Sequence, residues 1–210
     1  MAAGKSRNRN SRAVVLSRKT SFRGKVFSVT SERILEPNGV TYVRDVVRHS
    51  GSVVILAVDD SEGEPHILLE RQYRYAAGQD LWEIPAGRKD KNETPLAGAK
   101  RELREETGYT ARLWRKALFF YPSPGFVDET MTVFLALDLK PGTAQPEEDE
   151  KIEYELVPLL KVLKMISSGE IKDGKTIAAV LWFREWEAQR PADTMSRRPT
   201  PRLDARDQTI

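Results

Sequence analysis

Three glutamates in one short segment carry the clearest chemistry in this chain of 210 residues. Glu102, Glu105 and Glu106 fall within Thr94–Thr107, a predicted helix, and their spacing places them on neighbouring positions of one helical face. Like charges at this spacing repel each other by about 0.2–0.5 kcal/mol per pair, so the arrangement gains stability only when a cation bridges the carboxylates. A solvated, charged helix face is the alternative interpretation.

The composition limits which cation these carboxylates could hold. The chain has no cysteine and only two histidines, His49 and His66, which excludes a disulfide scaffold, a thiolate zinc site and a thiol nucleophile. Oxygen ligands alone favour hard cations, so Mg²⁺, or else Mn²⁺, is the predicted metal. Arg101 is expected to pair with Glu93 or another carboxylate and thereby orient the ligands.

Charge is unevenly distributed along the chain. Residues 1–25 contain eight lysines or arginines and no acid, whereas residues 26–188 carry a net charge of −7. The acidic body suits an enzyme that concentrates divalent cations better than a nucleic-acid binder. No apolar run reaches the length of a membrane span, and the basic N-terminus lacks the apolar core of a secretory signal. We therefore expect a cytoplasmic protein with no membrane contact.

The glutamate-bearing helix has clear start and stop signals. Thr94 occupies the N-cap position, Pro95 the first helical position and Gly108 the C-terminal cap. An apolar stripe with i, i+3, i+7 spacing begins at Leu96, which predicts that the face carrying this stripe is buried.

Strand and helix patterns flank this segment on both sides. The Asn38-Gly39 pair predicts a β-hairpin. Strands are expected at 26–30, 33–35, 40–47, 52–58, 66–74, 81–85, 111–120, 130–137 and 154–157, and further helices at 159–167 and 175–187. This order predicts a mixed α/β sandwich. We expect a disordered basic tail over 1–20, an N-terminal β-sheet region over 21–50, the main domain over 51–188 and a second disordered tail over 189–210.

The segment between Gly87 and Tyr109 reads GRKDKNETPLAGAKRELREETGY and resembles the Nudix box of the Nudix hydrolases. The matching positions are Gly87, Glu93, Arg101, Glu102, Glu105, Glu106 and Gly108, with Leu103 in the aliphatic position. Tyr109 departs mildly, because an aliphatic residue is commoner there. A motif with so many fixed positions is far more specific than a lone glycine pattern.

The resemblance implies a Nudix α/β/α sandwich that hydrolyses a nucleoside diphosphate linked to another group. By position, Glu102 and Glu106 would be the principal metal ligands, joined by Glu105, which is also a candidate catalytic residue, and by the carbonyl of Ala86. The metal would polarise the diphosphate and hold the attacking water, so no covalent nucleophile is needed. The remaining box residues, Gly87, Glu93, Arg101 and Gly108, would have structural roles.

Features outside the box resemble the ADP-ribose pyrophosphatase branch of this family, over about residues 24–187. They are Pro124, sixteen residues after Gly108, the Glu70–Arg74 strand and the segment Lys172–Thr176. Arg74 would clamp a diphosphate through its guanidinium group, and Glu83 would bond a metal-bound water or Arg74, or merely end a strand. Pro124 and Gly125 would lie near the substrate's adenine or terminal ribose.

The resemblance also implies that the general base comes from the acidic loop 147–150. Glu150 aligns best, with Glu148 and Glu153 as rivals, and the alternative is a solvated acidic loop without a role. Our hypothesis is that this loop closes over the substrate and that Glu150 deprotonates the water.

The strands at 24–50 resemble a small sheet that this branch exchanges between subunits, so a homodimer is predicted. The substrate base is expected to stack on an aromatic residue near this sheet, such as Phe27 or Tyr42. His49 and the four tryptophans are expected to serve packing rather than catalysis.

Three functions remain open at this level. The first is Mg²⁺-dependent hydrolysis of ADP-ribose to AMP and ribose 5-phosphate. The second is hydrolysis of another nucleotide sugar, such as GDP-mannose. The third is a non-catalytic Nudix module that binds a nucleotide or RNA through the basic N-terminal tail. The intact carboxylates at Glu102, Glu105 and Glu106 argue against the third.

Overall fold

The computed structural model describes residues 12–61, 63–145 and 152–189. The chain folds into two compact units. The N-terminal unit comprises the described residues up to Gly51 together with Tyr121–Thr130, and the main unit comprises Ser52–Phe120 and the described residues from Met131 onward.

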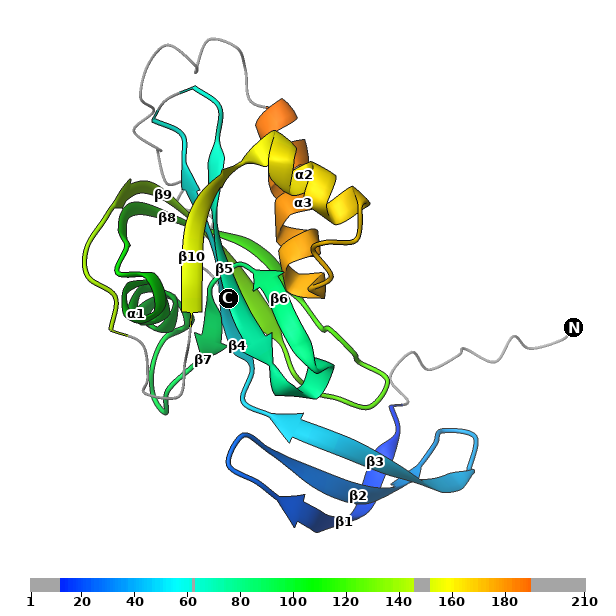
Figure 1. Cartoon of the computed structure of the whole chain (residues 1–210). Coiled ribbons are helices and arrows are strands. Elements are labelled where there is room, and N and C mark those ends of the chain that lie inside the picture. The colour runs from blue at the N-terminus through cyan, green and yellow to red at the C-terminus, as the bar shows by residue number, and fades with distance from the viewer. Residues whose placement is uncertain (1–11, 62, 146–151, 190–210) are drawn as a thin grey trace, which may run out of the picture. The chain divides into compact units, whose positions relative to one another are not determined.

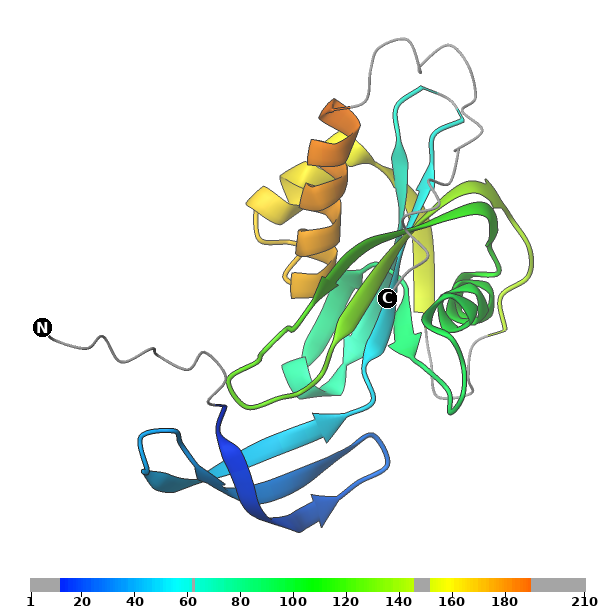
Figure 2. The same ribbon diagram turned by 180° about the vertical axis from the view of Figure 1, so that it is seen from behind.

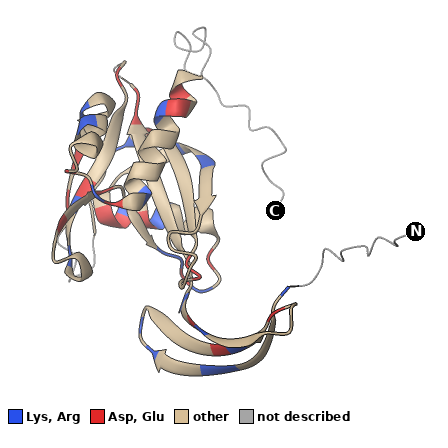
Figure 3. Ribbon diagram, turned by 90° about the vertical axis from the view of Figure 1, so that its right-hand side faces the viewer, with Lys and Arg blue, Asp and Glu red and all other residues tan. Residues whose placement is uncertain are grey.

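The N-terminal unit contains a three-stranded antiparallel sheet of β1 (Val14–Arg23), β2 (Phe27–Leu35) and β3 (Thr41–His49), in that order (Figure 1). The predicted hairpin is confirmed: the β2–β3 turn is closed by a hydrogen bond from Gly39 N–H to Glu36 O of 2.9 Å, and Gly39 has a φ of +86° that favours glycine. Basic and acidic residues both occur along this sheet (Figure 3).

The boundary expected at residue 20 is wrong, because β1 begins at Val14. Residues 14–20 therefore belong to the sheet and not to a disordered tail. Every residue of β1 is exposed, so the strand has no buried face to produce an alternating pattern. Its order comes from backbone pairing with β2, for example between Lys19 and Ser31.

The segment 121–130 packs on the end of β3 within the N-terminal unit. Val47 N–H donates to Phe126 O at 2.8 Å, and Asp128 N–H donates to Val47 O at 3.0 Å. Arg48 Nη1 lies 2.8 Å from Asp128 Oδ2. The expected main domain, 51–188, is thus interrupted by ten residues that pack with the N-terminal sheet.

The main unit is built on a mixed sheet in the order β10-β5-β4-β9-β8, with β6 paired to β5 and β7 paired to β4. Its strands are β4 (Ser52–Asp59), β5 (His66–Arg74), β6 (Gln79–Glu83), β7 (Ala86–Arg88), β8 (Thr110–Phe120), β9 (Met131–Lys140) and β10 (Ile152–Pro158), and a 3-10 turn spans Tyr75–Ala77. The central strands β4 and β9 are parallel, and the other pairs are antiparallel.

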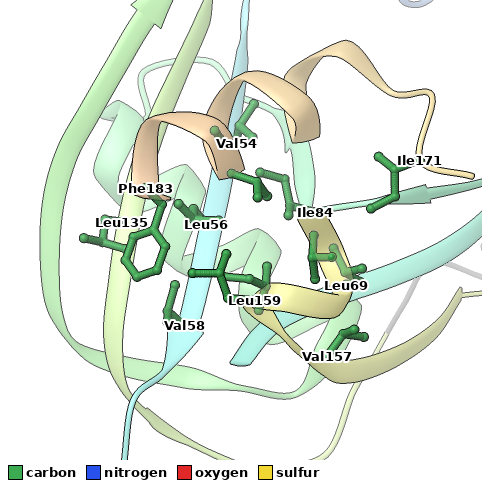
Figure 4. Packing of buried hydrophobic residues seen from close by; sticks show 14 of the residues in the cluster. Val54, Leu56, Val58, Leu69, Ile84, Leu135, Val157, Leu159, Ile171 and Phe183 are labelled. Atoms are coloured by element: carbon green, nitrogen blue, oxygen red, sulfur yellow. The ribbon is translucent and has the colours of Figure 1, made fainter. Parts of the chain in front are cut away.

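Helices cover both faces of this sheet, with α1 (Pro95–Thr107) on one face and α2 (Leu159–Ser167) and α3 (Gly174–Ala188) on the other (Figures 1 and 2). Alternate residues of β4 enter two cores: Val53, Ile55 and Ala57 pack with α1, whereas Val54, Leu56 and Val58 pack with α2 and α3 (Figure 4). A central strand buried on both faces is expected to read as a continuous apolar run. The predicted α/β sandwich with a small N-terminal antiparallel sheet is confirmed.

The helices lie within a residue of their predicted bounds. Residues 159–167 form α2, and α3 extends the expected 175–187 by one residue at each end. Among the described residues, no helix is long and apolar enough to cross a membrane.

Candidate active site

Helix α1 is fixed at both ends by local interactions. Thr94 Oγ1 accepts a hydrogen bond from Ala97 N–H at 3.2 Å, and Pro95 starts the helix. At the other end, Gly108 adopts a φ of 73° and its N–H donates to Arg104 O at 2.9 Å. The buried Leu103 fixes the rotation of the helix against the sheet. These features confirm the predicted caps and set where the three glutamates project.

Arg101 gathers the carboxylates of the box. Its Nε lies 3.2 Å from Glu93 Oε1, its Nη2 lies 2.9 Å from Glu102 Oε1, and its Nη1 lies 2.9 Å from Glu105 Oε2. Nη2 also donates to the carbonyl of Arg88 at 3.0 Å. The hydrogen bonds from Arg101 lower the pKa of Glu93. The predicted Arg101–Glu93 pair is confirmed.

The strand β7 lies directly beside Glu102. A side chain on Gly87 would overlap the carboxyl group of Glu102, so any other residue here would force that carboxylate to move. Ala86 precedes Gly87 in β7 and pairs with Val54 of β4. Glu102 therefore lies against the short strand that carries Ala86, the residue whose carbonyl is the expected fourth oxygen ligand.

The side chains present fit a hard divalent cation by their chemistry. All candidate ligands are oxygens, and Glu106 is only 5% exposed, as befits a carboxylate that pairs with a cation or a metal. Among residues 12–61, 63–145 and 152–189, however, no three acidic or histidine side chains converge as a metal-binding group. Two of the glutamates, Glu102 and Glu105, are held instead by Arg101. Whether Glu102, Glu105, Glu106 and Ala86 act as ligands stays a prediction.

Arg74 and Glu83 form a two-point ion pair between neighbouring strands. Arg74 Nε and Nη2 donate to the two carboxylate oxygens of Glu83 at 2.9 and 2.8 Å. The predicted alternative in which Glu83 bonds Arg74 is therefore the one observed. The hydrogen bond to Glu83 raises the pKa of Arg74, although partial burial acts to lower it. The nearby charges of Glu70 and Glu106 raise this pKa further. Arg74 thus lies within electrostatic range of the box helix.

Lys175 joins this ion pair and was not among the predicted site residues. Its Nζ contacts Glu83 Oε2 from the first turn of α3. Burial raises the pKa of Glu83, but hydrogen bonding to Arg74 and the charge of Lys175 outweigh it and keep that pKa below its ordinary value. The resemblance of Lys172–Thr176 to a family segment was the only sequence signal that pointed here.

The acidic loop that carries Glu150 and Glu148 lies outside the described residues. Its two flanks are described. On one side, Gln145 N–H donates to Glu105 O at 2.8 Å, at the C-terminal end of α1. On the other side, Ile152 pairs with Gln72 in β5, two residues before Arg74. The two described flanks of the acidic loop therefore lie at the end of the box helix and beside the strand that carries Arg74.

Pro124 and Gly125 lie in the N-terminal unit, in the segment 121–130. They line a small hollow whose other walls are Val46, Tyr121, Phe126, Val127 and Asp128. Nothing in this hollow tests the predicted contact with adenine or ribose, which stays a prediction.

The residues expected to serve packing do so. His49 Nδ1 accepts a hydrogen bond from Gly51 N–H at 3.1 Å, which fits a turn. Trp82, Trp182 and Trp186 pack on the larger core, and Trp114 packs on the core below α1.

Comparison with known proteins identifies the family. The model of the NUDIX domain matches residues 48–180, more than half of the chain. The chain belongs to the Nudix family. This Nudix hydrolase is 41% identical to ADP-ribose pyrophosphatase of Bacillus subtilis over 175 residues, which are 82% of this chain and 93% of the relative. It is 35% identical to ADP-ribose pyrophosphatase of Mycobacterium tuberculosis over 170 residues, 79% of this chain and 80% of the relative.

The fold is shared with a solved structure, described as the crystal structure of an ADP compounds hydrolase. The TM-score is 0.73 at 23% identity, over 83% of this Nudix hydrolase and 94% of the solved chain. The likeness confirms the predicted Nudix fold.

Proposed function

We propose that this Nudix hydrolase cleaves the diphosphate bond of ADP-ribose and releases AMP and ribose 5-phosphate, with Mg²⁺ or Mn²⁺ bound at the box. The observation that carries the proposal is the ion pair of Arg74 and Glu83, held within electrostatic range of Glu106 on the box helix. A guanidinium beside a set of carboxylates provides both requirements of the substrate: a cation for the diphosphate, and oxygen ligands for a metal. The names of the two relatives support ADP-ribose as the substrate.

Glu102, Glu105, Glu106 and the carbonyl of Ala86 would hold the metal, which polarises the diphosphate and supplies the activated water when bound. Metal binding would then replace the contacts of Arg101 with Glu102 and Glu105, while Arg101 keeps its contact with Glu93. Arg74 would bind the diphosphate oxygens. Glu83 holds the guanidinium group of Arg74 in a fixed orientation through two hydrogen bonds.

Glu150 is the proposed general base. It takes a proton from water as the new bond to phosphorus forms, and the bond between phosphorus and the bridging oxygen breaks. The anchors of its loop at Glu105 and at Gln72 support this role, because they bring the loop's two ends to the box helix and to β5. Glu105 is the alternative base on the box helix itself.

We also propose a homodimer, built by exchange of the N-terminal sheet, in the cytoplasm. The exposed strand β1 supports the dimer, because its apolar side chains Val14, Val15, Leu16 and Phe22 are each about half exposed and would be covered by a partner. Pro124 and Gly125 are proposed contacts to the nucleoside. Light scattering tests the dimer, and a monomer at micromolar concentration would overturn it.

The central experiment measures release of AMP from ADP-ribose, beside ADP-glucose and GDP-mannose, with Mg²⁺ and with EDTA. We expect metal-dependent turnover with the highest kcat/KM for ADP-ribose. Preference for GDP-mannose would keep the metal chemistry and overturn the substrate. Folded protein that binds ADP-ribose with Mg²⁺ but turns over none of the three would overturn catalysis.

A further inference from the structure

Lys175 lies against the ion pair that the proposed reaction uses. Its Nζ contacts Glu83 Oε2 and lies 3.1 Å from Asp173 Oδ2, and its side chain is only 9% exposed. An ammonium group this buried is poorly placed to touch a substrate. It does touch the carboxylate that holds Arg74 in place.

The start of α3 is fixed so that this contact is maintained. Asp173 Oδ2 accepts hydrogen bonds from the N–H of Thr176 at 2.9 Å and from its hydroxyl at 2.6 Å. Thr176 Oγ1 in turn accepts a hydrogen bond from the N–H of Ile84 at 2.9 Å. Ile84 directly follows Glu83, so the helix that carries Lys175 is tied to the end of the strand that carries Glu83. Thr176 is fully buried, which makes this link rigid.

The charges around Glu83 explain why a second cation is needed. Glu70 and Glu83 are partners in the β5–β6 register, and both side chains are buried. Like charges directly opposite each other in a sheet are destabilising, and a buried carboxylate that loses one of its cations takes up a proton or moves. With Lys175 in place, one oxygen of Glu83 contacts two cations and the other faces Arg74 Nε.

We propose that Lys175 is a positioning residue, which holds the carboxylate of Glu83 in the orientation that presents the guanidinium of Arg74 to the substrate's diphosphate. The inference rests on the proposed function, because it takes Arg74 as the diphosphate ligand. Lys175 acts through Glu83 and makes no contact with the substrate.

Binding and turnover of ADP-ribose test this role separately. In EDTA, where no hydrolysis occurs, calorimetry gives the Kd of ADP-ribose for each variant. Lys175→Met should weaken binding by about tenfold, as expected when a charged hydrogen-bond partner is lost. With Mg²⁺, the same variant should raise KM by a similar factor and change kcat little. Lys172→Met is the matched control, since Lys172 Nζ donates to the exposed Gln79 Oε1, at 3.0 Å, rather than to the buried carboxylate of Glu83.

A double-variant cycle distinguishes positioning from a purely structural effect. If Lys175 acts through Glu83, Lys175→Met should have no further effect on Kd in a Glu83→Gln background, where the carboxylate charge is absent. The inference would be overturned if the two substitutions weakened binding by factors that multiply in the double variant. It would also be overturned if Lys175→Met alone had the wild-type Kd. If Lys175→Met alone does not fold, the Kd of Glu83→Gln is compared with that of the double variant, because the double variant removes both members of the Lys175–Glu83 ion pair. Wild-type protein that binds ADP-ribose without hydrolysing it would overturn the proposed reaction only, and protein that does neither would overturn both.

Discussion

Gly87 and Glu102 lie so close together that any side chain at residue 87 would overlap the carboxyl group of Glu102. The absence of a Cβ at Gly87 is therefore what allows Glu102 to lie against β7. The carbonyl of Ala86 belongs to the same strand. Gly87 thus leaves room for the carboxylate of Glu102 beside the strand that carries Ala86, the other proposed source of a ligand.

Replacement of Gly87 by alanine should displace Glu102 and reduce kcat/KM for ADP-ribose by at least about a hundredfold, because metal ligands tolerate little displacement. The fold should survive, since the overlapping atom is the end of a flexible side chain. Gly174→Ala is the control, because nothing lies within 4 Å of that position. Circular dichroism and steady-state kinetics check both variants, and near-normal kcat/KM in Gly87→Ala would contradict the proposed ligand arrangement.

Arg101 should be far more sensitive to substitution than Arg104 on the same helix. Arg101→Met removes the contacts with Glu93 and with the carbonyl of Arg88, which the metal would not replace, so the glutamates of α1 would lose the group that fixes them beside β7. We expect about a 10- to 100-fold loss of Mg²⁺ affinity, the range for groups that orient metal ligands. Arg104 is exposed, and Arg104→Met should match wild type. Titration of activity with Mg²⁺ measures both, and equal responses would argue against the role of Arg101.

Glu106 offers a test of metal binding that does not depend on turnover. If it is a ligand, Mg²⁺ should raise the Tm of the wild-type protein by mass action, and the rise should disappear in Glu106→Gln. EDTA should abolish activity, and added Mg²⁺ should restore it. Thermal unfolding with and without Mg²⁺ provides the measurement. A Glu106→Gln variant that Mg²⁺ stabilises as much as wild type would place the metal elsewhere.

The general base can be located by three parallel substitutions in and beside the acidic loop. Glu150→Gln should lower kcat by about 10²- to 10⁴-fold with little change in KM, the usual contribution of general-base catalysis. Glu148→Gln and Glu153→Gln should have small effects. A normal kcat in Glu150→Gln, with a large loss in one of the other two variants, would assign the base to that residue.

Glu32 should make the N-terminal sheet less stable as the pH falls into the acidic range. Burial raises its pKa, but hydrogen bonds from Arg48, Arg18 and Thr30 outweigh this and lower the pKa to about 2. A carboxyl group with a depressed pKa stabilises the fold fully above its unfolded value, near 4.5, and loses that contribution as pH falls toward 2. Urea unfolding between pH 6 and pH 2.5 should show this loss in wild type, with a flatter dependence in Glu32→Gln. Parallel curves for the two proteins would refute the assignment.

The sequence alone was sufficient for features governed by local rules. The caps of α1 at Thr94 and Gly108, the hairpin at Asn38-Gly39 and the Arg101–Glu93 pair all involve residues within eight positions of one another or of the element they end. Backbone conformation, helix periodicity and charge pairing act over that range, so their outcome can be predicted from residue types and spacing. The Nudix box was recognisable for the same reason.

Tertiary structure decided what depends on contacts between distant parts of the chain. The strand β1 has no buried face, so only its pairing with β2 makes it a strand. The segment 121–130 belongs to the N-terminal unit through hydrogen bonds to Val47, about 80 residues earlier. Lys175 meets Glu83 across a sequence separation of 92 residues. No local pattern encodes these contacts, because they form only when separate elements pack and bring their backbone groups and charges together.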